Sequence, residues 1–124
     1  MVCPDCLRPI LVGLSLLLMA LLTGCREADP IISVTDTGQA ERLSIGKTAG
    51  QGAIKELRLE VEGQLNGTAQ LVVIMEGQPF HVFTLSDSID LTWKERWPHD
   101  RARLAYNPGT ATGGSLRIKY RFID

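Results

Sequence analysis

Alternating apolar and polar residues dominate the chain from residue 41 onward, and an alternation of period two indicates half-buried β-strands. The alternation is cleanest at residues 56–62, where leucine and valine side chains alternate with charged ones. Residues 63–67 interrupt it with two glycines and an Asn-Gly pair, which is typical of tight turns. Residues 69–75 are apolar on both faces, as in a central strand. These segments predict a β-hairpin.

Further extended segments follow the same pattern, each bounded by turn residues. They cover residues 80–85, 89–94, 101–106 and 115–123, with turn signals at 77–79, 86–88, 97–100 and 107–114. The sequence therefore predicts an all-β domain, an antiparallel β-sandwich of about seven short strands with turns about 8 to 12 residues apart. A small, partly open β-barrel is the alternative architecture.

The inward positions of these strands predict the hydrophobic core. Trp93 follows the inward alternation and is assigned to this core. Trp97 lies outside the alternation and is open to either a core or a surface position. The predicted core comprises Leu57, Leu59, Val61, Leu71, Val73, Met75, Phe83, Leu85, Leu91, Trp93, Leu104, Tyr106, Leu116, Ile118, Tyr120 and Phe122.

Length and charge narrow the classes of function. The chain has 124 residues, which suffices for one domain. Its 13 basic and 14 acidic side chains give a formal charge of −1, so no excess of positive charge favours nucleic acid. We therefore expect no nucleic-acid partner.

Residues 1–24 have the layout of a secretory signal helix. Arg8 and the amino terminus precede an apolar run at residues 9–22, and small residues close this run. The 14 residues of the run would span roughly 21 Å as a helix, which is short for a bilayer core of about 30 Å. A cleaved signal is favoured over a lasting transmembrane helix.

The signal ends in Leu22-Thr23-Gly24-Cys25, which resembles the lipobox of bacterial lipoprotein precursors at all four positions. The resemblance covers residues 1–25. It implies that the Cys25 thiol receives a diacylglycerol, that the chain is cut before this residue, and that the new amino group is acylated, as by palmitate. Arg26, not aspartate, follows the cysteine, which resembles outer-membrane sorting in enteric lipoproteins. The implied product is anchored in the membrane by lipid and faces the periplasm.

Residues 25–40 are predicted to be the lipidated cysteine and a polar tether, which carries one apolar patch at residues 31–34 and leads into a β-sandwich domain at residues 41–124. Cys3 and Cys6 form a C-x-x-C pair, but cleavage before Cys25 would remove both thiols. No disulfide is then expected in the mature chain, so its stability relies on the packed core.

Candidate catalytic groups are few. Once Cys25 is acylated, the mature chain keeps two histidines and no free thiol. His81 lies in a predicted strand, whereas His99 lies beside Asp100 in a loop of mixed charge, without a Gly-x-Ser-x-Gly motif. The histidines and carboxylates also lack the spacing of metal ligands. We assign no catalytic residue, no metal and no cofactor.

Residues 93–101 hold the densest mixture of aromatic and charged side chains in the chain. Exposed tryptophan and arginine anchor interfaces and stack on sugar rings. The predicted binding residues are Trp97, Arg96, His99 and Arg101. The basic strand face of Arg117, Lys119 and Arg121 is a second candidate, either solvated or directed at anionic lipid.

The scarcity of catalytic groups favours a recognition module that is tethered in the cell envelope and binds a protein or a glycan through loops and a sheet edge. A small hydrolase or metal-dependent enzyme that uses His99 and Asp100 is one alternative. A structural subunit of the envelope is another.

Overall fold

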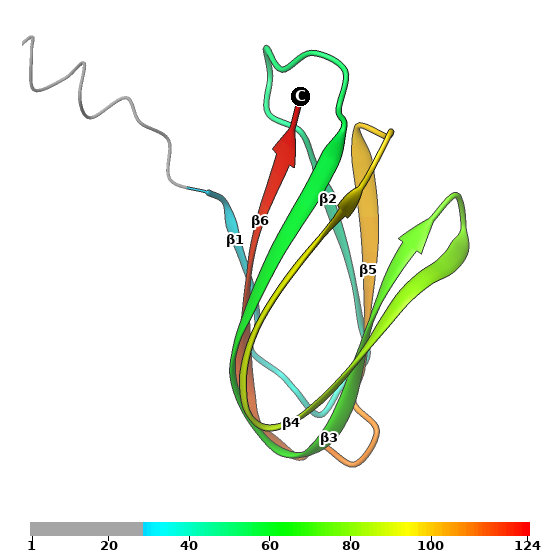
Figure 1. Cartoon of the computed structure of the whole chain (residues 1–124). Helices are drawn as coiled ribbons and strands as arrows, with labels where there is room; N and C mark the ends of the chain where they lie inside the picture. The colour runs from blue at the N-terminus through cyan, green and yellow to red at the C-terminus, as the bar shows by residue number, and fades with distance from the viewer. Residues whose placement is uncertain (1–28) are drawn as a thin grey trace, which may run out of the picture.

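The computed structural model describes residues 29–124, which form six β-strands (Figure 1). The all-β prediction is confirmed, since no helix occurs in this part of the chain. Residues 29–124 accordingly hold no helix with the length and apolarity needed to cross a bilayer. The strands are β1 (Ile31–Val34), β2 (Glu41–Gly46), β3 (Glu56–Met75), β4 (Gln78–Arg96), β5 (Arg101–Asn107) and β6 (Gly113–Ile123).

The strands form one antiparallel sheet that folds into two layers. Its order is β1-β6-β3-β5-β2, and β4 pairs with the other edge of β3. The N-terminal part of β3 pairs with β6 and its C-terminal part pairs with β5. The first layer thus holds β1, β6, the N-terminal arm of β3 and the C-terminal arm of β4. The second layer holds β2, β5, the C-terminal arm of β3 and the N-terminal arm of β4. Figure 1 shows β3 and β4 bending together at the bottom of the molecule. The predicted sandwich is confirmed.

Two predicted turns are bends inside continuous strands. Residues 63–67 and 86–88 were expected to end strands, but the first segment lies within β3 and the second lies within β4. A register shift between Leu65 and Thr68 accommodates the bend in β3, and Gly67 and Asp87 take positive φ values of 106° and 55° there. The predicted hairpin of residues 56–62 and 69–75 is therefore wrong. The count of about seven short strands falls to six, because β3 and β4 each pass through both layers.

The ordered domain begins before residue 41. Residues 31–34 were assigned to the tether, yet they form β1 and pair with β6 from Ile31 opposite Lys119 to Val34 opposite Leu116. Val34 is fully buried. Four residues therefore follow Cys25 up to the first described residue, Asp29, a connection much shorter than the predicted tether.

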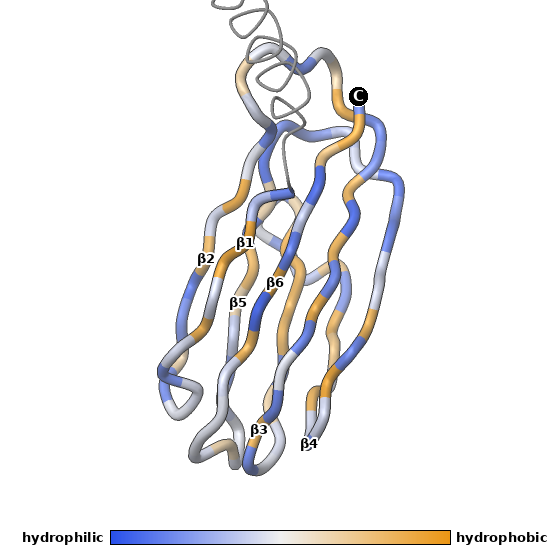
Figure 2. Tube along the Cα trace, turned by 90° about the vertical axis from the view of Figure 1, so that its left-hand side faces the viewer, coloured by the Kyte–Doolittle hydropathy of each residue, from blue (hydrophilic) through white to orange (hydrophobic). Residues whose placement is uncertain are grey.

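Most of the predicted core is buried between the two layers. The alternation that predicted it is visible in Figure 2 as hydrophobic and hydrophilic residues taking turns along β6 and β3. Tyr106 is fully buried and its hydroxyl donates to the carbonyl oxygen of Thr37 at 2.7 Å, while burial and the carboxylate of Asp36 raise the pKa of this phenol. Five predicted core residues are only partly buried and pack against the core from its rim: Met75, Phe83, Leu91, Trp93 and Tyr120.

The backbones of β3 and β6 approach closely near the bend. A Cβ atom on Gly114 would collide with the carbonyl oxygen of Gln64, and one on Gly63 would collide with that of Ser115. Gly114 also has a φ of 112°, which L side chains rarely adopt. Glycine is therefore required at this contact for two independent reasons.

Replacing Gly114 by alanine is expected to lower the free energy of unfolding by about 2 to 4 kcal/mol, because the change adds both the collision and the backbone strain. Urea unfolding followed by circular dichroism measures the loss. Gly113→Ala is the matched control: φ is not positive there, and the nearest atom to the new Cβ is Asn66 Nδ2 at 3.4 Å. Equal losses in both variants would contradict the prediction.

Candidate functional site

Ring-bearing side chains gather where the two arms of β4 face each other. Neighbouring rings in this group have centroids 4.5 to 6.4 Å apart. The chain has two Trp, two Tyr, three Phe and two His residues, so the group contains both tryptophans, two of the phenylalanines and both histidines. This aromatic seam comprises Phe80, His81, Phe83, Trp93, Trp97 and His99.

A β-bulge places Phe80 in the seam. His81 pairs with Val73 and Pro79 pairs with Ile74, so Phe80 is an extra residue on β4. The bulge turns Phe80 toward the same side as His81, although they are adjacent in sequence. The Phe80 ring then lies edge-on to Trp97 at 5.6 Å.

The seam has an exposed rim. Phe80 is 44% exposed, and Phe83 and Trp93 are partly exposed. His81 is exposed and stacks on Trp93, with an interplanar angle of 30° and centroids 5.5 Å apart. This rim offers aromatic surface to a ligand, and it lies on β4, which pairs only with β3 among the described strands.

Trp97 is the buried base of the seam. Its exposed fraction is 0%, and its indole N–H donates to the carbonyl oxygen of Arg101 at 3.0 Å. The backbone N–H of Trp97 donates to the Lys55 carbonyl oxygen at 2.9 Å, which keeps the chain extended past Arg96 and continues the inward alternation from Trp93. The expectation that Trp97 lies outside the alternation is wrong. It is a core residue, and Trp93 is the more exposed tryptophan.

A groove of about 480 Å³ borders the seam. Trp97, His99 and Arg101 line it, so three of the four predicted binding residues come together. Arg96 does not line the groove, because it lies opposite Glu56 on the outer face of the first layer. Binding by these residues stays a prediction, but Trp97 contributes to the groove from a buried position.

Two polar contacts border the groove. His99 Nε2 lies 3.3 Å from Glu76 Oε1 and links the loop after β4 to the turn of the β3–β4 hairpin. Asp100 Oδ1 lies 3.4 Å from Lys47 Nζ. His99 and Asp100 are thus engaged by separate partners, and no serine, threonine or cysteine lines the groove. Residues 29–124 also contain no group of three or more His, Cys, Asp or Glu side chains arranged to hold a metal ion.

The predicted basic face on β6 is partly neutralised. Arg117 and Lys119 lie opposite Glu62 and Glu60 on β3. Lys119 Nζ is 3.6 Å from Glu60 Oε2, and Arg121 also approaches an acidic side chain, with its Nε 3.9 Å from Asp29 Oδ1. This surface carries mixed charge, which weakens its candidacy as a binding site for anionic lipid.

Sequence reasoning missed Phe80 and His81 as members of the seam. Alternation alone directs adjacent residues to opposite faces, and only the bulge brings these two to one side. The nearest signal in the sequence is Pro79, since proline within a strand is confined to edges and bulges.

No family model and no curated protein matches the chain. Solved structures resemble it at low identity. A chain described as "CBM4 structure and function" has a TM-score of 0.44 at 14% identity, and the match covers 74% of this chain and 63% of that one. "Crystal structure of PirA" has a TM-score of 0.43 at 15% identity, covering 78% and 98%. "EclA C-terminal domain; sugar-binding protein" has a TM-score of 0.40 at 13% identity, covering 77% and 79%.

Proposed function

We propose that the protein is a recognition module of the cell envelope that binds a glycan through the exposed rim of the aromatic seam. The observation that carries the proposal is Phe80, a large aromatic residue that a β-bulge holds 44% exposed beside two tryptophans. Contiguous apolar surface of this kind marks binding sites.

The composition of the rim favours sugar rings. Phe80 and Trp93 offer flat apolar surface, and the imidazole of His81 lies against Trp93 within the same rim. Sugars present C–H groups on one face and hydroxyls around the edge. A partly exposed ring can cover the C–H face, while neighbouring polar side chains such as His81, His99 and Glu76 can bind hydroxyls.

The lipobox resemblance supports the location. We propose that acylated Cys25 anchors the protein in the membrane, and Arg26 supports the outer membrane as its destination. A short connection to Asp29 would keep the domain near the bilayer surface and within reach of periplasmic polymers. The acyl chains supply attachment and the seam supplies recognition.

Replacing Phe80 by alanine is expected to weaken binding to insoluble cell-wall glycan by about tenfold or more, because hot-spot energy concentrates in a few aromatic anchors. Co-sedimentation of the purified acylated protein with the glycan measures the effect. Phe80→Leu keeps apolar volume without a flat ring and should also bind weakly.

Val82→Ala is the matched control. Val82 is 46% exposed on the same strand, but it lies opposite Val72 on the outer face of the second layer. Its replacement should leave glycan binding unchanged. Equal binding by wild-type protein and Phe80→Ala, with both folded by circular dichroism, would disprove recognition by the seam.

A further inference from the structure

We propose that the outer face of the second layer binds an extended acidic segment of a partner polypeptide. A second hollow of about 430 Å³ lies along β5 and β3 next to the groove beside the seam, and Ile74 lines both. Arg101 borders the first hollow and Asn107 borders the second. The six residue steps between them on β5 correspond to about 20 Å. Arg42, Arg101 and Arg103 lie along this surface, and we call it the arginine trough.

The floor of the trough is aliphatic. Val72 is paired with Ala105 on one side and with Val82 on the other, and all three point away from the core. Their neighbours Leu71 and Val73 are fully buried on the inner face, as the alternation requires. Val82 is 46% exposed. An apolar stripe therefore faces solvent on the outside of the sandwich.

The arginines of the trough lack acidic partners. Arg42 lies opposite Ala105, Arg103 lies opposite Ile74, and Arg101 is on the same face of β5 as Arg103. All three are exposed, and none of the ion pairs formed within residues 29–124 involves them. The outer face of the first layer interleaves acidic residues with its basic ones. Arg58, Lys119 and Arg121 each have a carboxylate within 4.0 Å. Arg96 and Arg117 form no ion pair within residues 29–124, but they lie opposite Glu56 and Glu62.

Nearby carboxylates compensate this charge only in part. Asp100 lies 3.4 Å from Lys47 Nζ, and Glu76, which borders the first hollow, lies 3.3 Å from His99 Nε2. Glu41 also borders the second hollow, but strand alternation directs it away from the face that carries Arg42. The trough thus keeps positive charge beside an apolar floor, and its complement is a molecule that carries negative and apolar groups together.

The spacing of the arginines favours an extended polypeptide. Arg101 and Arg103 are two residues apart on one strand face, which matches the distance between alternate side chains of an extended segment. Guanidinium groups bind carboxylates through two parallel hydrogen bonds. Acidic residues at alternate positions would reach them, and apolar residues would cover the aliphatic floor. That floor has no exposed aromatic ring on which a sugar would stack.

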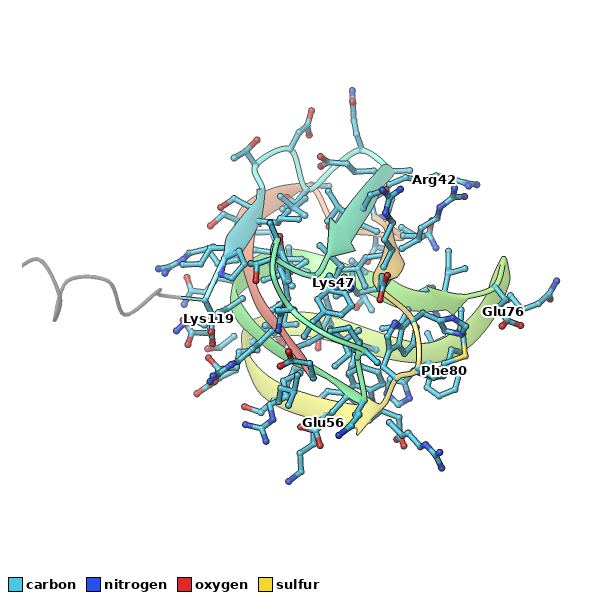
Figure 3. All side chains as sticks on the ribbon, turned by 90° about the horizontal axis from the view of Figure 1, so that it is seen from above. Arg42, Lys47, Glu56, Glu76, Phe80 and Lys119 are labelled. Atoms are coloured by element: carbon cyan, nitrogen blue, oxygen red, sulfur yellow. The ribbon has the colours of Figure 1, made fainter. Side chains whose placement is uncertain are left out.

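The place of the trough argues against the bilayer as its occupant. Viewed from above, Arg42 and Glu76 lie on one side of the molecule and Lys119 lies on the other, beside β1 (Figure 3). If Cys25 is the anchor, as proposed above, four residues reach at most about 14 Å from it to Asp29. Asp29 lies near Arg121 on the first layer, so the trough faces away from the anchored side.

The test uses the acylated protein in detergent and a short synthetic peptide of alternating glutamate and valine. We expect the peptide to bind wild-type protein, and we expect binding to weaken as salt rises. The double variant Arg42→Ala with Arg103→Ala should weaken it at least tenfold. Arg117→Ala, an exposed arginine on the other layer, should leave it unchanged. Phe80→Ala should also leave it unchanged, which separates this proposal from recognition by the seam.

Several results would overturn the inference. A peptide of alternating lysine and valine that binds equally well would show that charge is not recognised. Stronger, arginine-dependent binding of a polyuronate or of phosphatidylglycerol vesicles would identify a glycan or a membrane as the occupant instead. Undiminished peptide binding by the double variant would place the peptide elsewhere on the protein.

Discussion

Replacing Cys25 by alanine is expected to abolish lipid attachment and leave the chain uncleaved before this residue, because only a thiol forms the thioether that precedes cleavage in lipoproteins. The wild-type chain should begin at Cys25 and carry the mass of its acyl groups. Each buried CH₂ contributes about 0.8 kcal/mol, so two or three acyl chains hold a protein stably in a membrane. Intact-mass spectrometry of the membrane fraction measures both outcomes.

The two upstream thiols provide the control. Cys3→Ala combined with Cys6→Ala should give the same mature mass as wild type, because cleavage before Cys25 removes both residues. Wild-type mature protein that is found in the soluble fraction, without acyl mass on Cys25, would contradict the anchoring proposal. It would leave recognition by the seam untouched.

Trp97→Ala is expected to lower the free energy of unfolding by about 3 to 5 kcal/mol, the usual cost of deleting a large buried aromatic side chain. Trp97 is fully buried, it contacts Phe80 and His99, and its indole N–H satisfies the Arg101 carbonyl oxygen. The variant loses this packing and also the hydrogen bond to the Arg101 carbonyl oxygen. Equilibrium urea unfolding followed by circular dichroism measures the effect.

Trp93 supplies the comparison. It packs against the core from a partly exposed position, so Trp93→Ala should cost less than Trp97→Ala, on the order of 1 to 3 kcal/mol. Trp97→Phe should recover most of the packing while losing the hydrogen bond to Arg101, at a cost of about 1 kcal/mol for that bond. A larger loss at Trp93 than at Trp97 would show that the order of burial is reversed.

The two-residue repeat of apolar positions determined that the domain is built of β-strands, and it determined most of the core. Leu57, Leu59 and Val61 were placed inward by alternation alone, and all three are fully buried. This succeeds because a strand with one buried face repeats every two residues, and a slip by one residue would expose its whole apolar set. The proposed lipid anchor likewise rests on the sequence, since enzymes would act on residues 22–25 as a linear motif.

Tertiary structure decided where strands end and which side chains meet. Residues 63–67 carry the chemistry of a turn, but pairing with β4 and β6 on both sides keeps them within β3. Trp97 is buried where its backbone N–H donates to the carbonyl oxygen of Lys55, forty-two positions earlier, a contact that no local pattern encodes. The same holds for Phe80, whose bulge depends on how β4 registers against β3.

For the two proposed binding surfaces as well, the sequence determined one part and tertiary structure the other. Alternation indicates that Arg101 and Arg103 share a face of one strand, but their lack of acidic partners depends on β2 and β3 lying beside them. The seam needs residues 80–83 to meet Trp93 across the bend in β4. Local sequence determines the direction of a side chain from its own strand, because steric constraints on the backbone are local. Its neighbours across the sandwich are set by long-range strand pairing, which only the folded chain establishes.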